Sequence, residues 1–164
     1  MRQWAMVLTV LALLAGCDQQ RVSKLEPGVA TEADLKREFG EPTRIIEKAD
    51  GTKLYEYPRQ PEGVTNYIAV VGSDGKLTAL TQQLTPENFA QVQPGMTQAA
   101  VRTLLGKTAK TERFDLKPDE EHWLWRFEEK GGQRRVFTVT FDREGKVKST
   151  AIGDDPRDTQ VGGK

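Results

Sequence analysis

The chain has 164 residues, of which 24 are basic and 24 acidic, so its formal net charge at neutral pH is zero. This balance gives no electrostatic reason to expect nucleic-acid binding, and no basic cluster is interleaved with aromatic residues. A mean hydropathy of −0.60 with 29% charged residues indicates a water-exposed body rather than a bundle of membrane helices or a barrel.

The N-terminus has the pattern of a secretory signal. Arg2 supplies a positive charge, and residues 4–15 are almost entirely apolar. This run is shorter than the roughly 20 apolar residues that a membrane-spanning helix needs. We therefore expect residues 1–16 to be a signal peptide, which leaves residues 17–164 as the mature chain.

The only cysteine, Cys17, directly follows Ala15 and Gly16. Two small residues before a cysteine resemble the lipobox of bacterial lipoproteins. The resemblance implies cleavage between Gly16 and Cys17, diacylglycerol on the Cys17 sulfur and an acyl chain on the new amine. Each buried methylene contributes about 0.8 kcal/mol, so several acyl chains would anchor the protein firmly. The alternative is an ordinary signal peptide with a chance cysteine.

Behind a short tether, residues 17–24, one pattern occurs twice. A proline–glycine pair precedes a threonine suited to cap a helix, a short amphipathic helix, and a glycine that would end it in a left-handed conformation. With one extra residue after Gly28, the copies align as Pro27-Gly28, Thr31, Leu35, Phe39 and Gly40 against Pro94-Gly95, Thr97, Val101, Leu105 and Gly106. Thr31 and Asp34 form a capping-box pattern in the first copy only. A further helix is expected from Pro86 to Val92, after Thr85.

After each helix the hydrophobic period changes to two, as in half-buried strands. The expected segments are Tyr55–Tyr57, Tyr67–Val71 and Lys76–Leu80 in the first copy, and Trp123–Phe127 and Phe137–Phe141 in the second, with weaker first strands at Ile45-Ile46 and Lys110–Phe114. We predict an α+β fold of two tandem repeats, residues 25–84 and 85–153. Each would be a short helix pair packed on a three- to four-stranded antiparallel sheet. Residues 154–164 are polar and are expected to form a disordered tail.

The second copy resembles the SmpA/OmlA, or BamE-like, lipoprotein domain. The residues that carry this resemblance are Pro94-Gly95-Met96-Thr97, Val101, Leu105-Gly106, Trp123-Leu124-Trp125 and Phe137–Val147. The first copy is a weaker match, because Val29-Ala30-Thr31 replaces Met-Thr and Gly72-Ser73 replaces Phe-Asp. The family implies an outer membrane lipoprotein that assists β-barrel assembly. A tandem arrangement also resembles β-lactamase-inhibitor proteins.

The resemblance implies a lipid-anchored envelope protein that faces the periplasm and binds protein partners. It would act as an accessory factor in outer membrane β-barrel assembly or in envelope integrity, and the alternative is an inhibitor or regulator of a periplasmic enzyme. The family favours the outer membrane. Asp18 resembles the inner-membrane retention signal of enteric bacteria, so the inner membrane stays open as an alternative.

No motif in the sequence indicates catalysis, a metal or a cofactor. The single histidine, His122, stands beside the aromatic strand without a second metal ligand. Trp123 and Trp125 are expected in the sheet core, with an exposed partner anchor as the alternative. Arg126 and Arg134-Arg135 could meet an acidic partner or anionic headgroups, although solvated strand ends explain them as well. We expect a non-enzymatic protein, and no partner-binding residue can be assigned.

Overall fold

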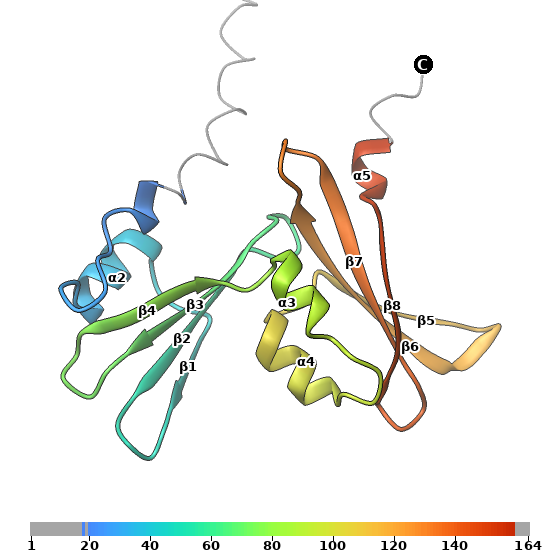
Figure 1. Cartoon of the computed structure of the whole chain (residues 1–164), viewed down its shortest axis with the longest axis horizontal. Helices are drawn as coiled ribbons and strands as arrows, with labels where there is room; N and C mark the ends of the chain where they lie inside the picture. The colour runs from blue at the N-terminus through green and yellow to red at the C-terminus, as the bar shows by residue number, and fades with distance from the viewer. Residues whose placement is uncertain (1–17, 19, 160–164) are drawn as a thin grey trace, which may run out of the picture. The chain divides into compact units, whose positions relative to one another are not determined.

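The computed structural model describes residue 18 and residues 20–159. The predicted signal peptide and lipidation site, Cys17 included, lie outside the described residues. The described chain has an α+β fold with two four-stranded antiparallel sheets (Figure 1), as the sequence predicted. The elements are α2 (Glu32–Phe39), β1 (Arg44–Glu47), β2 (Lys53–Pro58), β3 (Asn66–Val71), β4 (Leu77–Gln82), α3 (Pro86–Ala90), α4 (Gln98–Leu105), β5 (Lys110–Phe114), β6 (Lys117–Glu128), β7 (Arg134–Phe141), β8 (Val147–Asp154) and α5 (Pro156–Thr159).

The chain divides into two compact units. Unit 1 contains the described residues up to Tyr55 together with Ala69–Leu80, and unit 2 contains Glu56–Ile68 and the described residues from Thr81 onward. The boundary therefore crosses β2, β3 and β4, because the segment that joins β2 to β3 groups with the second unit. The domain boundary expected between residues 84 and 85 stays a prediction.

The two copies of the repeat share the same backbone hydrogen bonds. Gly28 donates to the carbonyl of Leu77, and Leu77 donates to the carbonyl of Ala30. In the second copy, Gly95 donates to Val147, and Val147 donates to Met96. The two residues that bond to Leu77, Gly28 and Ala30, are two positions apart. The two residues that bond to Val147, Gly95 and Met96, are adjacent in sequence. This difference is the extra residue after Gly28 that the sequence alignment required.

The helices of both repeats begin and end at the expected residues. Thr31 accepts from the N–H of Asp34 while Asp34 accepts from the N–H of Thr31, which completes the predicted capping box. Thr97 caps α4 in the same way by accepting from Ala100. Gly40 and Gly106 follow the helices with φ of 81° and 75°. Their ψ of −164° and −162° differs from the left-handed helical value expected, because the chain passes directly into an extended segment.

The core of unit 2 lies between helices α3 and α4 and one face of the second sheet. Alternate residues of β6 and β7 point toward the helices, and Phe89 of α3 stacks on Phe137 with ring centroids 4.3 Å apart. Burial of such aromatic rings is the main stabilising contribution in a chain without disulfides. The core cluster contains Leu84, Phe89, Val92, Val101, Leu105, Trp125, Phe127, Phe137, Val139, Phe141 and Val147.

The C-terminal segment corrects one prediction. Asp154 ends β8, and residues 156–159 form α5, so disorder from residue 154 onward is wrong for residues 154–159. The physical reason is Asp155, whose buried carboxylate accepts from the N–H of Arg157 and from Nε of Arg126 at 3.0 and 3.1 Å. A run of polar residues does not reveal such a cap in sequence. Residues 160–164 lie outside the described residues.

Candidate partner-binding site on the β5–β6 hairpin

The β5–β6 hairpin is formed by two strands of unequal length. In β5, Lys110 pairs with Leu124 and Glu112 with His122, and after a register shift Phe114 pairs with Lys117. β7 pairs with β6 from Glu121 to Glu128 and not with the preceding residues 117–120, which lie beside β5 alone. The turn at residues 115 and 116 is therefore the end of a two-stranded extension of the sheet.

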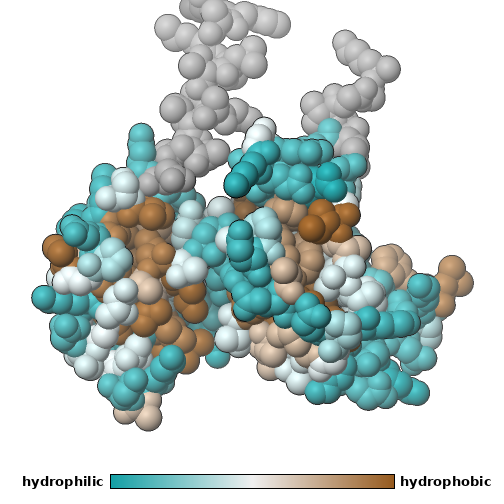
Figure 2. All heavy atoms as spheres, in the orientation of Figure 1, coloured by the Kyte–Doolittle hydropathy of each residue, from teal (hydrophilic) through white to brown (hydrophobic). Residues whose placement is uncertain are grey.

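Two apolar side chains are exposed at this end of the hairpin. Leu116 is 97% exposed and Phe114 is 50% exposed. Figure 2 shows hydrophobic surface at this end of unit 2, next to hydrophilic residues. Single exposed apolar side chains are common on protein surfaces, and these two are candidates for a partner contact because they lie at the same hairpin turn.

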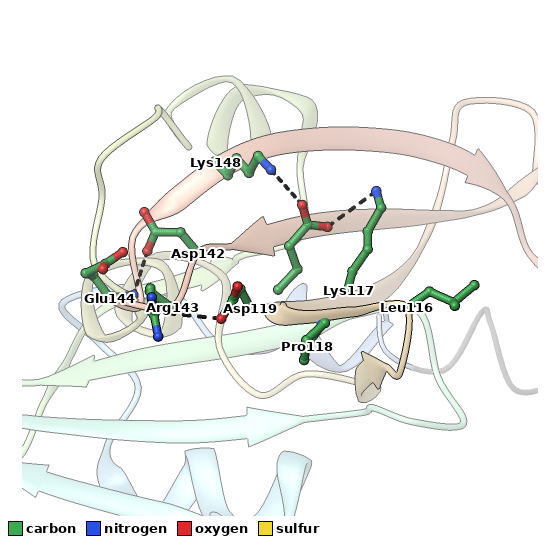
Figure 3. Close-up of a pocket in the computed structure, with 9 residues that line it drawn as sticks. Leu116, Lys117, Pro118, Asp119, Asp142, Arg143, Glu144 and Lys148 are labelled. Carbon is green, nitrogen blue, oxygen red and sulfur yellow. Dashed lines mark hydrogen bonds and ion pairs between the residues drawn. The ribbon is translucent and has the colours of Figure 1, made fainter.

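A polar hollow of about 680 Å³ adjoins Leu116. It is bounded by the start of β6 and the β7–β8 turn, and its lining residues are Leu116, Lys117, Pro118, Asp119, Glu120, Asp142, Arg143, Glu144 and Lys148 (Figure 3). Leu116 points away from the charged side chains in this view. The hollow thus combines an apolar projection with both signs of charge.

The charges around the hollow are paired with one another. Glu120 lies 2.6 Å from Nζ of Lys148 and 3.6 Å from Nζ of Lys117, and Asp119 lies 3.8 Å from Nε of Arg143. The hydrogen bond from Lys148, together with the charge of Lys117, lowers the pKa of Glu120. The hydrogen bond to Glu120 and the charge of its carboxylate raise the pKa of Lys148. Both groups therefore stay charged at neutral pH, where exposed pairs of this kind exchange readily for partner charges.

His122 supports the hairpin from the outer face of β6. Its Nδ1 lies 3.1 Å from Oγ1 of Thr140, and its Nε2 lies 3.6 Å from the Glu120 carboxylate. The Phe114 ring meets the imidazole edge to face, with centroids 5.1 Å apart. The lone histidine therefore occupies a packed position at the base of the hairpin, where it links Phe114 to Glu120.

Glu121, on the other face of β6, forms three side-chain hydrogen bonds. Its carboxylate accepts from the indole N–H of Trp123, the amide of Gln98 and the guanidinium of Arg113, each at 3.0 Å. The hydrogen bond from Trp123 lowers the pKa of Glu121 more than the charge of Arg113 does. Glu121 thereby fixes the start of β6 to helix α4.

The residues singled out in sequence are not gathered into one site. Trp125 is fully buried and donates to the carbonyl of Gly106 at 3.1 Å, so it belongs to the core as expected, and Trp123 is half-buried beside it. Arg126 pairs with Asp155, Arg135 with Asp154 at 3.3 Å, and Arg134 with Asp158 at 3.7 Å. The basic residues are thus engaged within unit 2.

Within the described residues, no group of three or more histidine, cysteine or acidic side chains has the arrangement of a metal site. No helix in the described part of the chain is long and apolar enough to cross a membrane. The hairpin itself carries carboxylates paired with cations, together with exposed apolar side chains.

Comparison with known families finds a match in the second half of the chain. Residues 82–151 match the family model of the outer membrane protein assembly factor BamE domain. This segment is BamE-like. The match runs from the end of β4 to within β8, so it includes the β5–β6 hairpin and the polar hollow. It confirms the SmpA/OmlA resemblance, and the residues before 82 lie outside it.

No curated protein matches the chain. Among solved structures, a DUF4309 family protein (YjgB) from Bacillus subtilis is similar at 17% sequence identity, over 83% of this chain and 86% of that chain, with a TM-score of 0.32. A likeness of this degree carries no argument about function.

The sequence predicted a strand at Lys110–Phe114 and another at Trp123–Phe127, but not the exposed apolar pair at the turn between β5 and β6. Phe114 and Leu116 are separated by Asp115 within an otherwise mostly charged segment. This alternation was the sequence signal for exposed apolar residues at the turn. It was not sufficient, because alternation on a short strand does not reveal which residues pass beyond the edge of the core.

Proposed function

We propose that this protein is a lipid-anchored, non-enzymatic accessory factor that binds proteins of the outer membrane β-barrel assembly machinery through the β5–β6 hairpin of its BamE-like segment. The anchor would be the acylated Cys17, with the body in the periplasm. The observation that carries the proposal is the match of residues 82–151 to the assembly-factor domain.

The geometry of the hairpin supports a binding role. Leu116 and Phe114 offer an apolar anchor, and burying a leucine or phenylalanine side chain in a partner would contribute about 1.5–3 kcal/mol. The paired charges of Glu120, Lys117 and Lys148 surround this anchor, so a partner could exchange its own charges for them at the rim of the contact.

The test is site-specific photo-cross-linking in the envelope of the native host. A photoreactive residue replaces Leu116 in the full chain, and a second variant carries it at Ser73, which is exposed in the β3–β4 turn of unit 1. We expect adducts with components of the outer membrane assembly machinery at position 116 and none of these at position 73.

Two outcomes would overturn the proposal. Equal adducts at both positions would mean that the hairpin has no special role. An adduct at position 116 with a single soluble hydrolase or protease would show that the protein inhibits an enzyme and does not act in barrel assembly.

The anchor is tested separately. Cys17→Ala should release the protein from membranes into the soluble periplasmic fraction, while the native chain should sediment with outer membranes in a sucrose gradient. Firm membrane association of Cys17→Ala would contradict lipidation, and sedimentation of the native chain with inner membranes would assign the retention role to Asp18.

A further inference from the structure

The outer edge of β8 is open along its second half. β8 is the last strand of the second sheet, and all of its residues after Val147 are exposed. An uncovered edge of this kind presents unpaired backbone N–H and C=O groups and invites pairing with another strand. In the described part of the chain, no strand pairs with this edge beyond Val147.

The register shows which residues face outward. Asp155 donates to the carbonyl of Arg134, so the backbone of Asp155 points toward β7. Because an antiparallel ladder alternates, Gly153, Ala151 and Ser149 also point toward β7. The N–H and C=O groups of Thr150, Ile152 and Asp154 therefore point away from the sheet.

The other parts of the sheet edge are protected. Val147 at the start of β8 is hydrogen-bonded to Gly95 and Met96. On the opposite edge, β5 is short and charged, and beyond it the side chain of Gln60 covers the backbone of Arg126. Among the described residues, the outward backbone of Thr150, Ile152 and Asp154 is thus the stretch of edge best suited to accept another strand.

We propose that this edge pairs with β8 of a second copy of the chain, antiparallel and with the two-fold axis at Ile152. The three outward residues are symmetric about Ile152, so Thr150 of each copy would lie opposite Asp154 of the other. Such pairing would form about six backbone hydrogen bonds. It would also place the two Ile152 side chains, each 47% exposed in one copy, directly against each other.

The charges of β8 favour a copy of itself as the occupant. The two charged residues of the strand, Lys148 and Asp154, lie at its opposite ends. With the axis at Ile152, Lys148 of each copy lies diagonally across from Asp154 of the other, which is favourable on both sides of the axis and adds to the pairs that these residues form with Glu120 and Arg135 in their own copy. A parallel arrangement would instead align like charges.

Cross-linking in native membranes tests the axis directly. Ile152→Cys is made in the full chain and treated with a short bifunctional maleimide. Residues directly opposite in a hydrogen-bonded pair have Cα atoms about 5.5 Å apart, so a covalent dimer is expected in high yield. Ser149→Cys is the matched control, because its two copies would lie about 20 Å apart along the strands. The native chain, with Cys17 alone, gives the background.

The outcomes separate the alternatives. A dimer with Ile152→Cys and at most a tenth as much with Ser149→Cys supports the proposal. Absence of the dimer, equal yields at both positions, or a cross-link from the thiol introduced by Ile152→Cys to a different protein would overturn it.

A second measurement uses light scattering on the detergent-solubilised full chain. Ile152→Asp would place two carboxylates opposite each other and should weaken the dimer at least about tenfold. Thr150→Pro removes an outward N–H while leaving the β7 ladder intact, so it should lose the dimer, whereas Thr150→Ala should retain it. An unchanged dimer in Ile152→Asp, checked to be folded by circular dichroism, would contradict the pairing.

Discussion

The side chain of Gln60 pairs with the backbone of Arg126 as a neighbouring β-strand would. Its Nε2 donates to the carbonyl of Arg126 at 2.7 Å, and its Oε1 accepts from the N–H of Arg126 at 3.1 Å. The pairing of β5 with β6 ends at Leu124, and the Gln60 amide supplies the hydrogen bonds to Arg126, two residues further along β6. One side chain thereby satisfies two backbone groups that would otherwise form an open edge.

Loss of this amide should destabilise unit 2. Gln60 is 5% exposed, and Gln60→Ala would leave both backbone groups of Arg126 without a partner. We expect a loss of about 1–3 kcal/mol in the free energy of unfolding, measured by urea denaturation. Gln60→Glu should not rescue it, because a carboxylate cannot donate to the carbonyl. Gln91→Ala, which removes an exposed amide at the end of α3, should change stability by less than about 0.5 kcal/mol.

Two glycines in equivalent positions should respond differently to alanine. Both Gly40 and Gly106 have positive φ, so each substitution carries backbone strain of roughly 1–3 kcal/mol. A Cβ at Gly106 would lie 2.6 Å from Oε1 of Gln83 and 3.0 Å from Nδ2 of Asn66, whereas one at Gly40 meets no atom within 4 Å.

The two glycine variants can be compared by thermal unfolding. Gly106→Ala should lower the melting temperature by more than Gly40→Ala does, because Gln83 and Asn66 hydrogen-bond the last carbonyls of α4 and cannot move freely. Equal shifts for the two variants would show that the Gln83 and Asn66 side chains move away from the new Cβ without loss of stability.

The buried carboxylate of Asp155 should matter far more than its neighbour. Asp155 is fully buried against Arg126, while the Asp154 side chain is 66% exposed in its pair with Arg135. Asp155→Ala would remove the carboxylate partner of the Arg126 guanidinium, which would keep its hydrogen bond to the Pro61 carbonyl, and should cost about 3 kcal/mol in urea denaturation. Asp154→Ala should cost less than about 1 kcal/mol. Similar losses for both variants would mean that water replaces the buried partner.

The capping box of α2 gives a pH dependence. The hydrogen bond from the backbone of Thr31, followed by those from its hydroxyl and from Arg37, lowers the pKa of Asp34 from 3.8 to about 2. A lowered folded-state pKa adds stability above the unfolded value, and this contribution is lost as the pH falls from about 4 to about 2.

The measurement is the stability difference between the native chain and Asp34→Asn. The native chain should be more stable at about pH 6, and the difference should shrink toward about pH 2.5 as Asp34 becomes protonated. Ala100 replaces the aspartate in the second repeat, so that helix provides no compensating titration. A difference that is constant across this pH range would contradict the role of the charged carboxylate.

Local patterns in the sequence predicted most of the secondary structure. Thr31 with Asp34, Thr85 with Pro86, and Thr97 mark helix starts by hydrogen bonds that close within four residues, so their meaning does not depend on the rest of the fold. The burial of Trp125 and Phe127 followed from alternation along β6 in the same way.

The sequence did not predict contacts between residues far apart in the chain. Asn66 reaches the carbonyls of Leu105 and Lys107, both at 2.8 Å, and nothing near Asn66 marks it as the cap of a helix about 40 positions later. For the same reason, Asp155 is indistinguishable in sequence from the rest of a polar tail. Its role depends on Arg126, which comes 29 positions earlier.

The sequence by itself determined the repeated order of helix and strands, because capping and hydrophobic periodicity act through neighbours along the chain. Only the tertiary structure decided that Gln60 closes one edge of the second sheet, that β8 leaves the other edge open, and that Phe114 and Leu116 project beyond the core. These features depend on which strand ends first and which distant side chain lies beside it, and pairing at long range leaves no periodic trace in a sequence.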